Sequence, residues 1–192
     1  MKLFTKSLFL VLSLSLAPAA FAQRQTFTVN SGTSQVAFTL AATGHTVQGT
    51  FGVQSGTINF DPNAQTISGS IVVAAASGNS GDSGRDKKMN LQVLNTGKFS
   101  EITFAPSSYT GKLATIGDST IQVSGIFTLH GVQHDLTLPM QIHIDKGALT
   151  AKGKFTVPYV KWGLKDPSFF VLKVAKEVDI DLNLTGTVAA AQ

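Results

Sequence analysis

The chain has no cysteine among its 192 residues. Disulfide bonds, cysteine-ligated metal centres and a lipid anchor attached through cysteine are therefore excluded. An exported protein folds without disulfides when it is large enough to bury a core of its own. Motifs of common enzyme classes are missing too, because the sequence holds no nucleophile elbow, no phosphate-binding loop and no H-E-x-x-H zinc motif.

Charged residues are also scarce. Asp, Glu, Lys and Arg make up 14% of the chain, against 43% apolar residues, and the formal net charge is +4. The basic residues are scattered, with Lys87-Lys88 as an adjacent pair, whereas a nucleic-acid footprint needs a clustered basic face. We therefore expect no nucleic-acid partner, and a protein with much apolar surface to bury.

The N-terminus carries an export pattern. Residues 1–22 contain two lysines near their start, then a mainly apolar stretch, and end on the small-x-small triplet Ala20-Phe21-Ala22. This pattern predicts a cleavable signal peptide, because the apolar stretch is shorter than the roughly 20 residues of a membrane span. We expect export to a bacterial periplasm and a mature chain of one domain over residues 23–192.

Apolar residues then recur at every second position. In the longest run, residues 136–144, Leu, Leu, Met, Ile and Ile alternate with Thr, Pro, Gln and His. Such alternation is typical of strands with one buried face. His130-Gly131 and Lys146-Gly147 fit the short turns of β-hairpins, so consecutive strands should pair antiparallel. About eight such strands must close or form a sandwich to hide their edges, and an eight-stranded barrel has room for one ligand. We predict an all-β fold.

Residues 82–96 depart from this rhythm and predict a short helix. Ser83 is placed to cap it, with Asp86 three residues on, and Gly97 fits its end. Met89 and Val93, four residues apart, share one helical face. We expect this helix to lie across one mouth of the barrel.

Seven segments along the mature chain carry a resemblance to a known family. They are Ser34–Phe38, Gly49–Phe51, Ser55–Pro62, Arg85-Asp86, Val93–Thr96 with Lys98-Phe99, Gly125–Val132 and Val178–Leu182. In order and spacing they resemble the YceI-like polyisoprenoid-binding family of exported proteins. The resemblance implies an antiparallel eight-stranded lipocalin-like β-barrel with a short helical insertion. It also implies a binding protein without enzymatic activity or cofactor, which holds an isoprenoid chain, such as a polyprenyl tail or a quinone, in a lengthwise apolar tunnel.

Two segments differ from the family pattern. Many members have a histidine shortly after the opening strand, where this chain has Ala41–Gly44 and its histidine follows at His45. Residues 157–168 resemble only a subset of the family. The identity of the lipid is therefore the inference that transfers least well.

The alternating apolar residues leave two interpretations open, since they either fill a solid core or line a tunnel. The resemblance favours a tunnel, for which the predicted lining is Val36, Phe38, Leu40, Phe51, Ile58, Phe60, Ile71, Val73, Met89, Phe104, Ile121, Val123, Phe127, Leu138, Met140, Ile142, Phe155, Ile180 and Leu182. A hydrocarbon chain that leaves a membrane for such a tunnel gains little net free energy, so we expect reversible carriage.

Four residues are predicted at the tunnel entrance or against a ligand head group: His45, Arg85, Tyr159 and Trp162. A simpler interpretation pairs Arg85 with Asp86 as a local ion pair at the helix start. Tyr159 and Trp162 lie in a proline-bounded loop, where they line the entrance, dock on a membrane or only hold the loop together.

Two other functions remain open at this stage. A metal-dependent hydrolase would use His45, His130 and His134, because imidazole is a common metal ligand. No carboxylate stands at metal-motif spacing, and His143 should face outward because it alternates with apolar residues, so we expect no metal site. A non-catalytic interaction module of the stress response or the envelope is the other alternative. The direction of lipid transfer, transient membrane contact and a homodimer are likewise left open.

Overall fold

A computed structural model describes residues 24–190, so the predicted signal peptide, residues 1–22, lies outside the described residues. The strands are β1 (Gln25–Val29), β2 (Gln35–Ala42), β3 (His45–Asp61), β4 (Thr66–Ala74), β5 (Glu101–Thr110), β6 (Gly117–Leu129), β7 (Val132–Asp145), β8 (Ala148–Val157) and β9 (Val178–Ala190). Three short helical segments follow β4: η1 (Ala75–Ser77), α1 (Ser83–Lys88) and η2 (Met89–Val93). Within the described residues, none of these is long and apolar enough to cross a bilayer as a helix.

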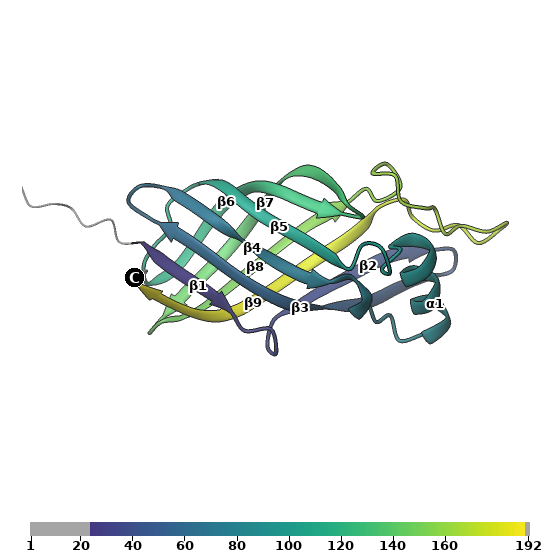
Figure 1. Cartoon of the computed structure of the whole chain (residues 1–192), viewed down its shortest axis with the longest axis horizontal. Helices are drawn as coiled ribbons and strands as arrows, with labels where there is room; N and C mark the ends of the chain where they lie inside the picture. The colour runs from purple at the N-terminus through teal and green to yellow at the C-terminus, as the bar shows by residue number, and fades with distance from the viewer. Residues whose placement is uncertain (1–23, 191–192) are drawn as a thin grey trace, which may run out of the picture.

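The strands close into one antiparallel barrel (Figure 1). Each of β3 to β8 pairs with the next strand in the chain, and the ring closes because β1 and β2 both lie between β9 and β3. β1 covers one half of that position and β2 the other, so nine strands occupy eight positions. The predicted eight-stranded lipocalin-like barrel with a helical insertion is therefore confirmed.

The break between β1 and β2 is held on the barrel wall by local hydrogen bonds. The Asn30 amide donates to the Thr185 carbonyl at 2.8 Å, and the Asn30 carbonyl accepts from the amides of Thr33 and Ser34. Ser34 Oγ accepts from the Thr185 amide at 3.0 Å. The chain thus leaves the sheet for one turn and returns to the same strand position, a shift that strand alternation does not signal.

The predicted hairpins are present in the structure. His130 and Gly131 have φ of 53° and 75°, and Lys146 and Gly147 have φ of 47° and 79°. Positive φ at both central residues is the geometry of the type I′ turn, whose twist matches that of the flanking strands. These turns join β6 to β7 and β7 to β8.

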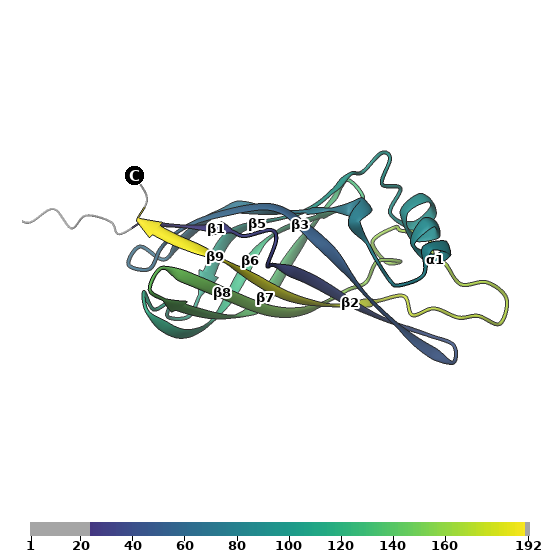
Figure 2. The ribbon, with the colours of Figure 1, turned by 90° about the horizontal axis from the view of Figure 1, so that it is seen from below.

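The connections divide the barrel into two unlike ends. One end, which we call the mouth, carries four connections: the β2–β3 turn, residues 75–100 between β4 and β5, the β6–β7 turn, and residues 158–177 between β8 and β9. The short connections 62–65, 111–116 and 146–147 lie at the other, the far end, with the C-terminus. Figure 2 shows α1 and the loop before β9 extending beyond the barrel at the mouth.

The insertion differs in detail from its prediction. Asp82, not Ser83, is the N-cap of α1, and its carboxylate accepts from the Arg85 amide at 2.7 Å. The predicted stop at Gly97 is also wrong. The chain leaves the helix after η2, and Asn95 takes the left-handed conformation with φ of 48°. Asparagine tolerates this conformation better than most residues, so it ends the helix two residues earlier than the glycine would.

The loop over the mouth is anchored by Tyr159. Its side chain is 5% exposed, and its hydroxyl donates to the Ala175 carbonyl at 2.6 Å. Burial, with a smaller contribution from the Asp166 carboxylate, raises the pKa of Tyr159 to about 12. The phenol therefore stays protonated in the folded protein at a pH where an exposed tyrosine ionises.

Replacing Gly186 with alanine should destabilise the barrel. A Cβ at Gly186 would lie 2.0 Å from the Thr28 carbonyl oxygen, so β1 and β9 would have to separate. We expect the free energy of unfolding to fall by about 1–3 kcal/mol in urea titrations. Gly52→Ala is the control, because its Cβ would meet only the Ser77 side chain, at 3.5 Å. Equal stabilities of the two variants would contradict the close approach of β1 to β9 at Gly186.

Tyr159 should make stability fall at alkaline pH. Between pH about 10 and 12 the unfolded state binds fewer protons at this residue than the folded state, so the free energy of unfolding decreases as pH rises. Urea titrations at pH 9 and 11 should show Tyr159→Phe losing less stability between the two pH values than wild type, by roughly 1–2 kcal/mol. Tyr109→Phe is the comparison: burial raises the pKa of Tyr109 as well, but less than that of Tyr159, so this variant should change the pH dependence by a smaller amount. An unchanged pH dependence in Tyr159→Phe would be the contrary result.

Candidate functional site

The barrel encloses a lengthwise cavity of about 770 Å³. Its wall draws on every strand position, from Phe27 and Leu149 near the far end to Lys88 and Lys173 at the mouth. Pockets for small molecules typically measure about 300–1,000 Å³ and are mostly apolar. The barrel therefore has a lumen large enough for a ligand rather than a solid core.

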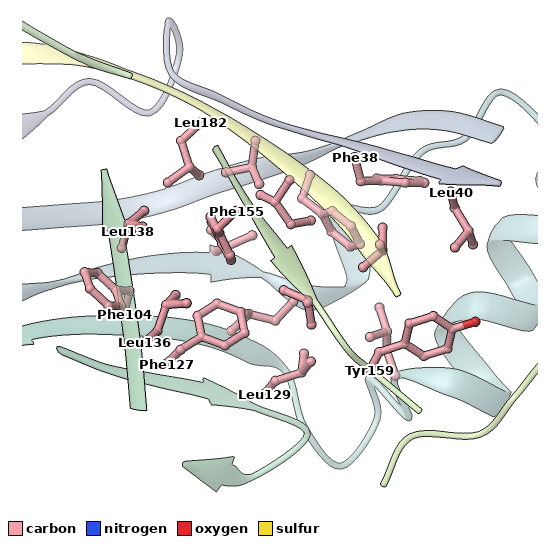
Figure 3. Close-up of a pocket in the computed structure, with 18 of the residues that line it drawn as sticks. Phe38, Leu40, Phe104, Phe127, Leu129, Leu136, Leu138, Phe155, Tyr159 and Leu182 are labelled. Carbon is pink, nitrogen blue, oxygen red and sulfur yellow. The ribbon is translucent and has the colours of Figure 1, made fainter. Parts of the chain in front are cut away.

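The side chains that line the middle of this cavity are almost all apolar (Figure 3). Leu138, at 2% exposure, is among the most buried side chains. Phe127 and Phe155 meet edge to face with ring centroids 5.9 Å apart, and Phe38 and Phe51 lie 5.4 Å apart. A surface of this kind offers contact and exclusion of water but few hydrogen-bonding partners, so it suits an apolar chain.

All 19 residues of the predicted lining lie on the cavity wall. Strand alternation places them there, because successive side chains of a strand point to opposite faces. The wall also contains residues that the prediction missed, among them Val47, Leu94, Leu113, Leu129, Leu136, Val157, Leu164 and Leu184. Leu136, Val157 and Leu184 continue alternating runs and were open to prediction, whereas Leu94, Leu113 and Leu164 come from connections whose fold the pattern does not give.

The far end of the cavity is closed by side chains. Leu113, from the connection between β5 and β6, is buried against Phe60 and Tyr109 in one apolar cluster. The Tyr109 hydroxyl donates to the Asp61 carbonyl at 3.3 Å, and burial, followed by the Asp61 carboxylate, raises the pKa of Tyr109. Asp61 itself is 1% exposed and caps the following turn by accepting from the Asn63 and Ala64 amides.

Polar groups gather at the mouth instead. Seven of the polar residues on the cavity wall come from connections or strand ends at that end: Thr43, His45, Ser80, Asp82, Arg85, Lys88 and Lys173. Arg85, Lys88 and Lys173 are basic, and Asp82 is a carboxylate. The pKa of Asp82 is lowered chiefly by the hydrogen bond that it accepts from the Arg85 backbone amide. The cavity is therefore amphipathic along its length, with an apolar interior and a polar, mainly basic opening.

Arg85 does not pair with Asp86, contrary to the simpler interpretation of the sequence. Both side chains bind Ser80 instead. Arg85 Nε donates to Ser80 Oγ at 2.7 Å and its Nη2 donates to the Ser80 carbonyl at 2.9 Å, while the Asp86 carboxylate accepts from the Ser80 amide at 2.9 Å. This network ties α1 to the segment before it and holds Arg85 on the cavity wall at the mouth.

The predicted entrance residues have different positions. His45, Arg85 and Tyr159 lie on the cavity wall, whereas Trp162 does not. The Trp162 ring stacks on His134, with centroids 4.0 Å apart and planes 7° apart, and lies 5.8 Å from the Phe127 ring. Trp162 thus packs beside a lining residue and holds the loop on the barrel, which is one of the three roles that its place in the loop left open.

The structure does not bring the histidines together. His45 Nδ1 contacts the Thr43 carbonyl in the β2–β3 turn, the His130 ring packs against Phe99 at a tilt of 51°, and His134 stacks on Trp162. Over residues 24–190, no group of three or more His, Asp or Glu side chains is placed to hold a metal ion.

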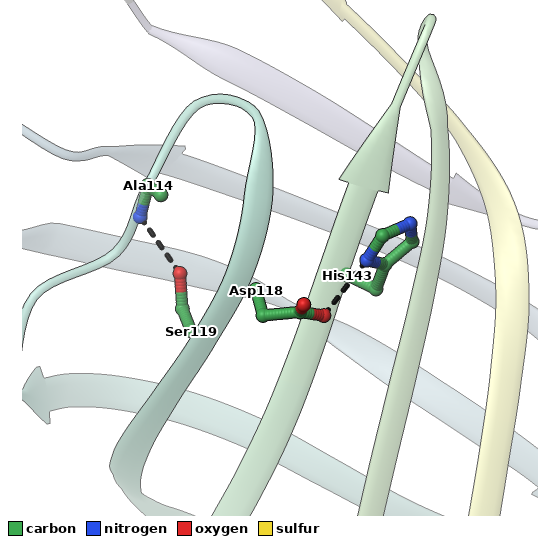
Figure 4. A network of polar contacts seen from close by, with 4 residues as sticks. All are labelled: Ala114, Asp118, Ser119 and His143. Carbon is green, nitrogen blue, oxygen red and sulfur yellow. Dashed lines mark hydrogen bonds and ion pairs between the residues drawn. The ribbon is translucent and has the colours of Figure 1, made fainter.

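His143 faces outward, as its place in the alternating run predicted (Figure 4). It lies near the far end of the barrel, where its Nδ1 is 2.8 Å from Asp118 Oδ1, and both side chains are more than half exposed. The neighbouring Ser119 accepts from the Ala114 amide at 2.8 Å. These contacts fix the outer surface next to the connection between β5 and β6 and do not reach the cavity.

Solved structures share this fold. BcnA of Burkholderia cenocepacia superposes with a TM-score of 0.68 at 20% identity, covering 83% of this chain and 99% of that one. A polyisoprenoid-binding domain of Saccharophagus degradans, implicated in plant cell wall breakdown, gives 0.61 at 15% identity, covering 86% and 98%. The YCEI protein of Campylobacter jejuni gives 0.53 at 16% identity, covering 100% and 99%. A search of curated proteins found no match.

A family model provides the assignment that these distant structural matches cannot. The model of the YceI-like domain matches residues 27–186, which extend from β1 to β9 and include the insertion at the mouth. The matched range includes part or all of every strand and every residue that lines the cavity. This chain therefore belongs to the YceI-like domain family.

Proposed function

We propose that this protein is a carrier for an isoprenoid or a similar long-chain lipid, such as a polyprenyl chain or a quinone, and that it is a binding protein rather than an enzyme. The observation that carries the proposal is the apolar cavity of about 770 Å³, which opens at the mouth, where its polar groups gather. The solved polyisoprenoid-binding domain of the same fold supports it.

The wall of the cavity matches a lipid in two respects. Its interior offers contacts to a hydrocarbon tail, at roughly 0.8 kcal/mol for each methylene removed from water. Its opening offers His45, Arg85 and Lys173 to a polar head group. A lipid that comes from a membrane has already left water, however, so its net gain in the cavity is small and its carriage is reversible.

Closing the lumen with a larger side chain should remove the lipid. Ala151 lies on the cavity wall and is 4% exposed, so Ala151→Trp places an indole in the lumen. Protein purified from a host that makes isoprenoids should yield an isoprenoid in an organic extract analysed by mass spectrometry. After removal of lipid and re-loading with a polyprenyl alcohol, the Kd of Ala151→Trp should be at least about tenfold higher than that of wild type.

Lys152→Trp is the matched control for this experiment. Lys152 is the next residue of β8, is exposed, and points to the outer face of the barrel, so the same substitution there leaves the lumen open. Thermal unfolding of both variants separates loss of binding from loss of folding. A wild-type extract free of lipid, or unchanged binding by a folded Ala151→Trp, would count against the carrier function.

We further propose that the carrier works in the periplasm after cleavage of residues 1–22. The composition of this segment supports the proposal: two lysines, an apolar stretch and the triplet Ala20-Phe21-Ala22. Expression of the full chain in a Gram-negative host should release a protein in the periplasmic fraction whose intact mass begins at Gln23. A product of full-length mass in the cytoplasmic fraction would refute export.

A further inference from the structure

Exposed apolar side chains concentrate at the mouth of the barrel. Across the described part of the chain, the exposed large hydrophobic residues are Leu91, Val132, Phe169, Phe170, Val171, Leu172 and Ile116, and all except Ile116 belong to the mouth. Four are consecutive, with exposures of 66%, 79%, 81% and 57% for Phe169 to Leu172. Scattered exposed apolar residues are ordinary, but a contiguous group of this kind marks an interaction surface.

These four residues form the tip of a small hairpin that protrudes beyond the barrel (Figures 1 and 2). Phe169 and Leu172 exchange two backbone hydrogen bonds, each of 2.9 Å, so Phe170 and Val171 are the two corner residues. Below the corner, the Val174 amide donates to Ser168 Oγ at 3.0 Å. The tip is thus ordered by its own backbone, and little conformational entropy remains to be lost when it binds.

The hairpin is also fastened to the barrel. The Thr43 amide donates to the Lys173 carbonyl at 2.8 Å, and the Lys173 amide donates to Thr43 Oγ1 at 2.9 Å. The Ala175 amide donates to the Ala41 carbonyl at 2.8 Å. The extended end of β2 therefore supports the hairpin from one side, and the apolar tip has a fixed position relative to the mouth.

Phe170, the first corner residue, has a backbone conformation that is unusual for phenylalanine. Phe170 has φ of 49°, a left-handed conformation that glycine or asparagine adopts readily and a bulky side chain does not. Its ring packs edge to face on Phe169, with centroids 4.4 Å apart, and remains 79% exposed. A phenylalanine at this corner serves neither the turn nor the core.

The exposed tip is continuous with the cavity. Phe169 and Leu172 lie on the cavity wall as well as on the surface, and Pro167 and Val174 continue the wall inward. An apolar path thus leads from the lumen to the corner residues without crossing the polar groups of α1.

The mouth is positively charged around this path. The connections 75–100 and 158–177 contain eight Lys and Arg, namely Arg85, Lys87, Lys88, Lys98, Lys161, Lys165, Lys173 and Lys176, against the four acids Asp82, Asp86, Asp166 and Glu177. Their net charge is +4, whereas the other residues of 24–190 hold five Lys and Arg against seven Asp and Glu, a net charge of −2. All of these cations except Arg85 are exposed.

From this juxtaposition we propose that the hairpin formed by residues 165–173, with Phe169–Leu172 at its tip, inserts Phe170 and Val171 into the surface of an anionic lipid bilayer. The surrounding lysines then bind the lipid head groups and hold the mouth of the barrel against the membrane. Aromatic and aliphatic side chains beside exposed lysines are the composition of interfacial membrane anchors. Each lysine near an anionic surface adds to the attraction within about one Debye length. The inference rests on the proposed carrier function, since it supplies the route by which a lipid enters the cavity.

A second copy of the chain is a poorer occupant of the same surface. The tip is convex and only two residues wide at its corner, whereas a stable protein interface buries about 800 Å² on each partner. Two mouths facing each other would also bring two sets of eight cations together. A negatively charged bilayer fits both the shape and the charge.

Flotation with vesicles tests the proposal. The mature chain should bind vesicles of phosphatidylglycerol and phosphatidylethanolamine, and bind phosphatidylcholine vesicles at least about tenfold more weakly. Phe170→Ser/Val171→Ser should lower partitioning to the anionic vesicles at least about tenfold, because the inserted apolar groups are lost. Raising the salt concentration from 0.05 to 0.5 M should weaken wild-type binding.

Ile116→Ser is the matched control, since Ile116 is 74% exposed but lies at the far end of the barrel. It should bind vesicles like wild type. The isoprenoid content of each purified variant is measured in parallel, and neither substitution touches the cavity wall, so each should still contain lipid. Equal vesicle binding by the hairpin variant and wild type, no preference for anionic lipid, or a dimer that the hairpin substitutions dissociate would overturn the proposal. Lipid-free wild-type protein would refute the carrier function instead.

Discussion

Closure of the sheet is the constraint on which the rest of this structure depends. Because β1 and β2 join β9 to β3, each strand of the barrel has hydrogen-bonded neighbours on both sides and none is an edge strand. Backbone groups that pair within the wall need no polar side chains from the interior as partners. An eight-position barrel is also the size at which its lumen either fills or holds one ligand, and here it stays open over about 770 Å³.

The difference between the two ends converts this cylinder into a site with a direction. Short connections and Leu113 close the far end, while long connections with helices, cations and an apolar hairpin surround the mouth. Strand ends alternate between the two ends of an antiparallel barrel, so the long segments 75–100 and 158–177, which follow even-numbered strands, necessarily meet at one end. A ligand with a polar head and an apolar tail therefore has a single favourable orientation in the cavity.

Much of the wall could be predicted from the pattern of residues. Period-two alternation identified inward positions such as Phe38, Leu138 and Ile180, and the glycine-containing turns gave the hairpins, because both signals are local. The helix cap at Asp82 and the stop at Asn95 were missed by one and two residues, since neighbouring polar residues compete for such positions. The role of Trp162 stayed open in the sequence because its position depends on stacking with His134, 28 residues away in the chain.

The sequence by itself determined an all-β chain with a short helical insertion, antiparallel order, the identity of most inward-facing residues and membership of the YceI-like family, because period, turn chemistry and family motifs are properties of the linear chain. Only the tertiary structure decided that two strands share one position, that the lumen is hollow, and that cations from two separate connections lie around one mouth with the exposed apolar hairpin. These features depend on contacts between residues far apart in the chain. Alternation shows which way a side chain points, but the space that remains in the lumen depends on all eight strand positions together.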